Sequence, residues 1–139
     1  MNISINRVSL KILTSDFTIS KISKSDFSTC NLDINDGVIS LVFEKDWISL
    51  VHQSAKVIPH AFSTESEWIA FCIDGVLEFS LAGILNSILS PLARADIGVL
   101  VYSSYDTDYI FVKMNNVELA VKELVNSGFY VFFEAVQHV

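Results

Sequence analysis

The sequence has few of the residues on which several common protein classes depend. Its two cysteines, Cys30 and Cys72, are far apart and form no CxxC pair, and its three histidines are scattered. These spacings argue against a disulfide framework and against a zinc site. Two isolated thiols are typical of reduced, buried cysteines in a cytoplasmic protein.

Basic residues are scarce as well. Lys and Arg number 9 against 16 Asp and Glu, so the formal net charge is −7. This charge would repel a phosphate backbone or an anionic membrane surface, and it predicts no nucleic-acid or membrane partner. The chain also lacks a membrane-spanning apolar run of about 20 residues, and we expect no secretory signal at its start.

Catalytic motifs are missing too. The sequence contains no HExxH, no GxSxG, no P-loop and no GxGxxG, so nothing indicates a metal, a nucleotide or another cofactor. We therefore predict a protein that is not an enzyme. A catalytic role for Ser103 or Asp108 is the weakest hypothesis, because no histidine lies near them in the sequence.

What the chain does have is apolar material for a core: 51% of its 139 residues are hydrophobic and 12% are aromatic. The length suits one domain or two very small ones. Runs rich in Val, Ile, Phe, Tyr and Trp predict strands at 7–13, 17–22, 37–43, 46–51, 67–73, 97–103, 109–113 and 129–135. Residues 23–29 suggest a short turn of helix, and residues 52–67, with Pro59, resemble a linker.

Two segments have helical periodicity instead. In 80–96 apolar residues recur at i, i+3, i+4 and i+7, Ser80 is a plausible N-cap, and Pro91 predicts a kink or break near Ser90. In 115–128 Asn115 and Glu118 are spaced as a capping box, and Gly128 suits the position after the helix. From residue 67 the order is therefore βαββαβ, the ferredoxin-like plan with an antiparallel sheet.

The N-terminal half contains a weaker copy of part of this pattern. "GVISLVFEKDWISLV" (37–51) and "GVLVYSSYDTDYIFV" (98–112) both run from Gly-Val through a strand and a polar turn to an aromatic residue and Ile. This repeat predicts an α/β (α+β) protein of two related modules. We place an eroded module at residues 1–64 and a complete one at 65–139.

Two polar loops of the second module should lie at one edge of its sheet. Residues 74–83 lead from a strand into a helix, whose first amides can hold a carboxylate. The acidic hairpin 103–108 could hold an ammonium or guanidinium group. Each acid is individually more often structural, because Glu78 can complement a helix dipole and Asp106 to Asp108 can shape a turn. The predicted ligand-binding residues are Asp74, Gly75, Glu78, Phe79, Ser80, Leu81, Ala82, Gly83, Ser103, Ser104, Tyr105, Asp106, Thr107 and Asp108.

The stretch "GVLEFSLAGILNSILSPLARADIGVLVYSSYDTDYIFVK" (75–113) resembles the tandem ACT-domain family, which includes the CASTOR-like amino-acid sensors and small bacterial stand-alone ACT-domain proteins. That resemblance implies two ACT-like modules side by side, usually dimerised, that bind an amino acid and regulate without catalysis. Glu78, Ala82 and Ser104 stand where the family usually has Asp, Thr and Thr. Ala82 lacks a hydroxyl at the helix start, which bears on the identity of the ligand.

Two functions remain open from the sequence. The first is a cytoplasmic, regulatory amino-acid-binding protein that forms a homodimer and acts on a partner protein. The alternative is a structural dimerisation or protein-interaction module that binds no small ligand. Both are compatible with a strand at 67–73 that is apolar on both faces, since its second face must also be covered.

Overall fold

The computed structural model describes residues 8–74 and 81–135 of the chain. These residues divide into two compact units, one made of 15–68 and the other of 8–14 together with 69–135. No helix of the described residues is long and apolar enough to cross a membrane. The elements in chain order are β1 (Ser9–Ser23), α1 (Lys24–Phe27), β2 (Val38–Phe43), β3 (Trp47–Gln53), β4 (Ser63–Asp74), α2 (Leu81–Arg94), β5 (Val99–Ser103), β6 (Asp108–Lys113), the 3₁₀ helix η2 (Met114–Asn116), α3 (Val117–Asn126) and β7 (Tyr130–Phe133).

The unit of residues 8–14 and 69–135 has the predicted βαββαβ order, which confirms the ferredoxin-like α+β class. Its strands are neighbours in the order β7-β1-β4-β6-β5. In the four-stranded plan β7 would lie beside β4, but here β1 lies between them and pairs with β7 in parallel, from Ser9 opposite Tyr130 to Ile12 opposite Phe133. The sequence pattern did not indicate this inserted strand.

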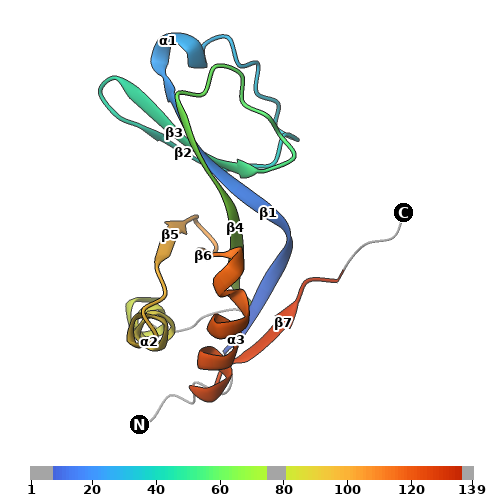
Figure 1. The fold of residues 1–139 in the computed structure, drawn as a ribbon, viewed down its shortest axis with the longest axis vertical. Coiled ribbons are helices and arrows are strands. Elements are labelled where there is room, and N and C mark those ends of the chain that lie inside the picture. The colour runs from blue at the N-terminus through green and yellow to red at the C-terminus, as the bar shows by residue number, and fades with distance from the viewer. Residues whose placement is uncertain (1–7, 75–80, 136–139) are drawn as a thin grey trace. The chain divides into compact units, whose positions relative to one another are not determined.

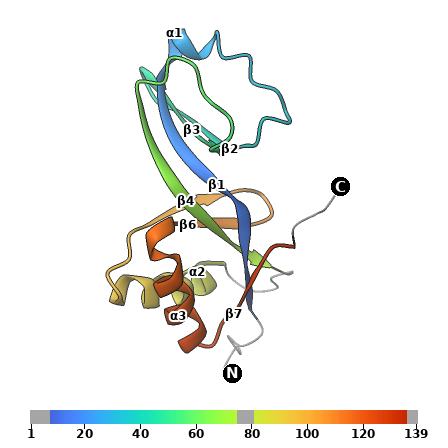
Figure 2. The ribbon, with the colours of Figure 1, turned by 45° about the vertical axis from the view of Figure 1, so that its right-hand side comes forward.

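Helices α2 and α3 lie side by side in this unit (Figures 1 and 2). Their apolar faces pack on alternate side chains of the strands, as the period of 3.6 in the helices and of 2 in the strands requires. The fully buried Ile88 of α2 and the nearly buried Leu124 of α3 belong to one core with Leu10 of β1, Phe71 of β4 and Ile110 of β6. The N-terminal segment of β1 is therefore part of this core.

Both helices differ in detail from the prediction. Helix α2 does not end at Pro91 but runs on to Arg94. The predicted capping box at Asn115 is wrong, because Met114–Asn116 form η2 and α3 starts after Asn116, whose side chain makes no capping hydrogen bond. Gly128 follows α3 with a φ of 98°, the left-handed conformation expected of glycine after a helix.

The unit of residues 15–68 is built on the β2–β3 hairpin. β3 pairs antiparallel with β2 and with β1, from Phe17 opposite Gln53 to Ser23 opposite Trp47. The two strands predicted at 7–13 and 17–22 form the single strand β1, and the short helix predicted at 23–29 is α1. The core of this unit is small; its buried members are Ile22, Cys30, Ile48, Leu50 and Ile58.

Candidate functional site

The turn Ser103–Asp108 joins strands β5 and β6 of a hairpin. Hydrogen bonds among its own residues fix the shape of this turn. The Ser104 amide donates to the Thr107 carbonyl oxygen at 2.8 Å, and the Thr107 amide donates to Ser104 Oγ at 3.2 Å. The Ser103 hydroxyl donates to Asp108 Oδ1, and Asp108 is only 5% exposed. Part of the polarity of this turn is therefore explained by hydrogen bonds that shape the hairpin.

The same turn contacts the end of β4. Thr107 Oγ1 donates to the carbonyl oxygen of Ile73 at 3.3 Å, and Asp74, the next residue, ends β4. A contact between residues 34 apart in the sequence brings the hairpin turn beside the point where β4 ends. The start of the loop that was predicted to share a site with the hairpin is thus next to it.

The remaining predicted residues lie in the loop 74–83, and the structure describes only some of them. Gly75, Glu78, Phe79 and Ser80 lie outside the described residues, and Leu81 and Ala82 are described only as the first backbone residues of α2. Gly83 is exposed in the first turn of α2, with open space where a Cβ would stand.

Of the three predicted carboxylates that the structure describes, two are accessible and one is not. Asp74 and Asp106 are exposed, whereas the Asp108 carboxylate is buried and engaged by Ser103. Tyr105, which directly precedes Asp106 in the turn, is fully exposed. Among the described residues of this region, Asp74 and Asp106 are consequently carboxylates that a cation from solvent could reach.

The described residues include several ionisable side chains whose pKa burial raises. They contain no group of three or more His, Cys, Asp or Glu side chains that could hold a metal ion. Burial raises the pKa of the Cys72 thiol to about 11, so the nucleophilic thiolate is almost absent at neutral pH. Burial also raises the pKa of the Tyr102 and Tyr109 phenols, which therefore stay protonated there.

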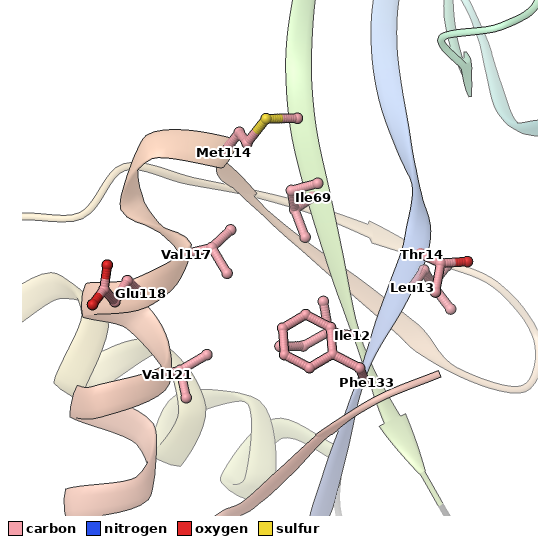
Figure 3. Close-up of a pocket in the computed structure, with 9 residues that line it drawn as sticks. All are labelled: Ile12, Leu13, Thr14, Ile69, Met114, Val117, Glu118, Val121 and Phe133. Atoms are coloured by element: carbon pink, nitrogen blue, oxygen red, sulfur yellow. The ribbon is translucent and has the colours of Figure 1, made fainter. Parts of the chain in front are cut away.

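A second feature, which the sequence analysis missed, is a groove beside α3 in the same unit. The α3 groove has a volume of about 650 Å³, and Figure 3 shows apolar side chains of α3, β1, β4 and β7 turned toward the same hollow. Val117 and Val121 lie on the apolar face of the helix predicted at 115–128, and nothing in the sequence marked them as half-exposed. The groove is lined by Ile12, Leu13, Thr14, Ile69, Met114, Val117, Glu118, Val121 and Phe133.

Carboxylates flank this groove on two sides. Glu118 lies in the first turn of α3, with its carboxylate turned away from the hollow (Figure 3). Glu134 follows β7, and its Oε2 accepts from the amide of Thr14 at 3.2 Å and from the Thr14 hydroxyl at 3.4 Å. The groove is thus apolar inside and acidic at its edges.

Comparison with known proteins finds one family model that matches part of the chain. Residues 63–126 match the model of the ACT domain. Protein Atu0741 from Agobacterium tumefaciens is 27% identical, with a TM-score of 0.78 over 96% of this chain and 98% of that one. No curated protein matches the sequence.

More distant solved structures share the fold alone. The regulatory subunit of aspartate kinase from Thermus thermophilus is 10% identical, with a TM-score of 0.63 over 86% of this chain and 95% of that one. The aspartate kinase of Clostridium acetobutylicum, described as an allosteric enzyme, is 17% identical with a TM-score of 0.62 over 86% of this chain. The chain thus corresponds to 34% of the length of that kinase.

Proposed function

Because residues 63–126 match the model of the ACT domain, and ACT domains are regulatory modules that bind amino acids, we propose that this chain is a non-catalytic, cytoplasmic regulatory protein. Its ligand is a free amino acid, held between the start of α2 and the β5–β6 turn. Binding shifts the population of two conformations and so alters a partner protein or a subunit interface.

The observation that carries this proposal is the hydrogen bond from Thr107 to the Ile73 carbonyl. It joins the hairpin turn to the end of β4, the strand that leads into α2. The contact brings the hairpin turn beside the end of β4, which supports a pocket for one small molecule at this edge.

The chemistry of these neighbours suits a zwitterion. The first amides of a helix have no intrahelical acceptor, so those of residues 81–83 are donors for an α-carboxylate. Asp74 and Asp106 are exposed acceptors for an α-ammonium or a cationic side chain. Ala82 supplies no hydroxyl, so the carboxylate is held by backbone amides.

The absence of catalysis is part of the proposal. Asp108 is occupied by Ser103 rather than free to activate a nucleophile, and both cysteines are buried thiols. Free cysteines also suit a reducing compartment such as the cytoplasm.

A second candidate function, an interaction module, is favoured by strand β2. Its Leu41, Val42 and Phe43 are 39%, 43% and 60% exposed. Among the described strands β2 pairs only with β3, so its other edge offers backbone groups to a further strand. A homodimer formed there would not require any small ligand.

A thermal-shift screen with the twenty amino acids tests the proposal. A ligand at about 100 times its Kd should stabilise the fold by about 2.7 kcal/mol, which raises the unfolding midpoint by about 5 °C or more for a chain of this size. Asp106→Asn should abolish that rise, whereas Glu44→Gln, the same kind of change in the turn of the β2–β3 hairpin, should leave it intact. A stable dimer that responds to no amino acid would instead establish the interaction module.

A further inference from the structure

The α3 groove follows from the insertion of β1 into the sheet. Neighbouring strands lie about 4.8 Å apart, so one extra strand between β7 and β4 widens the sheet by that amount. Two helices that could cover four strands leave part of a five-stranded sheet uncovered. The uncovered part is at the groove, whose lining includes the buried Ile12 of β1 and the half-buried Ile69 of β4.

Large apolar side chains border the groove yet remain in water. Phe133 is 66% exposed and Met114 is 47% exposed. In Figure 3 Phe133 of β7 faces Val117 and Val121 of α3 across the hollow. A volume of about 650 Å³ is within the range of about 300–1,000 Å³ typical of small-molecule pockets. A bound apolar group would therefore shield these side chains from water.

The charges at the edges restrict what that group can carry. Glu118 and the Glu134 carboxylate held by Thr14 flank the groove, and none of its described lining residues is basic. An anionic ligand such as a fatty acid would be repelled, whereas an ammonium group at the edge would be attracted. The net charge of −7 likewise favours a cationic ligand over an anionic one.

We propose that the α3 groove is a second binding site, for an apolar compound that carries an ammonium group. The apolar part fills the hollow between α3 and β7, and the ammonium group stays at the α3 edge beside Glu118, while Glu134 on the other side adds to the negative potential. The site differs in chemistry from the zwitterion site at the hairpin, because it provides no donors for a carboxylate among its described lining side chains apart from the Thr14 hydroxyl, which faces Glu134. It does not depend on the function proposed above.

Three probes that share one ring and differ in charge test the site: phenethylammonium, 2-phenylethanol and phenylacetate. Isothermal titration at pH 7 and low salt should give the tightest binding for phenethylammonium, about threefold weaker binding for the alcohol, and the weakest for phenylacetate. Equal or tighter binding of phenylacetate, or binding of none of the three, would overturn the proposal.

Matched variants locate the site on α3. Val121→Phe fills the groove and should weaken phenethylammonium at least tenfold, whereas Val125→Phe, one turn further along α3 and outside the groove, should not. Glu118→Gln should remove about threefold in affinity for phenethylammonium and leave 2-phenylethanol unchanged, with Glu123→Gln as the control.

Sedimentation separates this occupant from another copy of the chain. The proposal expects Val121→Phe to leave the oligomeric state as it is. A dimer that Val121→Phe dissociates would show that a second copy occupies the groove, and the assignment to a small amine would be wrong.

Discussion

The two hairpins of this chain share a sequence pattern and a turn geometry but differ in their surroundings. In the β2–β3 hairpin the Glu44 amide donates to the Trp47 carbonyl oxygen at 2.8 Å, and in the β5–β6 hairpin the Ser104 amide donates to the Thr107 carbonyl oxygen at 2.8 Å. The aspartates repeated in the sequence, Asp46 and Asp108, take different places, because Asp46 lies within its turn before β3, whereas Asp108 is the first residue of β6 and pairs with Ser103. One is exposed and the other is buried.

The surroundings of the two hairpins differ because different segments follow them in the chain. After β6 the chain forms α3, which packs against the unit's core, whereas after β3 the described residues contain no helix before β4. The outer strand of the first hairpin, β2, therefore keeps exposed apolar side chains. Similar strands thus acquire different roles according to the helices that cover them, and matched substitutions at repeated positions can measure this.

The largest contrast is expected at the repeated isoleucines of the second strands. Ile110 is fully buried in the core that α2 and α3 cover, and Ile48 is 2% exposed in the small core of the other unit. Ile110→Ala should cost about 4 kcal/mol and Ile48→Ala about 2 kcal/mol, because a sparser surrounding collapses more easily around the cavity. Urea unfolding followed by circular dichroism measures both, and an equal or larger cost at Ile48 would contradict the contrast.

A smaller contrast is expected at the repeated aspartates. Asp108→Ala removes the buried acceptor of the Ser103 hydroxyl and should cost about 1–3 kcal/mol. Asp46→Ala changes an exposed side chain and should stay within about 0.5 kcal/mol. The same unfolding experiment compares them. Should the two variants lose the same stability, the hydrogen bond to Ser103 contributes nothing beyond turn formation.

The smallest losses of stability are expected at the glycines that precede each hairpin. Gly37 has a φ of 73°, and a Cβ there would stand 2.8 Å from the Gln53 side chain, whereas Gly98 has open space and no left-handed backbone. Gly37→Ala should therefore cost about 1–2 kcal/mol. Gly98→Ala should be neutral or stabilise by up to about 1 kcal/mol. A loss of midpoint temperature at Gly98 matching that at Gly37 would refute this interpretation.

Much of the fold was predictable because its local signals agree. Periodicity located α2 and α3, alternation located the strands, and the order from β4 to β7 gave the ferredoxin-like class. The insertion of β1 was not predictable, because pairing between Ser9 and Tyr130 leaves no periodic trace in either segment. The sequence also did not indicate that β1 continues through residues 14–16, because the polar residues Thr14, Ser15 and Asp16 resemble a turn.

The candidate site was predictable only as two loops. The sequence indicated that 74–83 and 103–108 belong together, and the structure adds the contact of Thr107 with Ile73. It could not indicate that Asp108 is buried while Asp106 is exposed, since burial depends on the neighbouring strands. The α3 groove left no signal at all, because it exists only where β1 widens the sheet.

The place of β1 also has a consequence for biosynthesis and for dissection of the chain. Thr14 and Glu134, which hydrogen-bond at the edge of that sheet, are 120 residues apart in the sequence. The pairing of β1 with β7 can therefore form only after the ribosome has synthesised β7. A fragment that begins at the ACT match, residue 63, would leave β7 without its neighbour and remove Leu10 and Ile12 from the core. The residues matched by the family model thus omit a strand that contributes to the core of their unit.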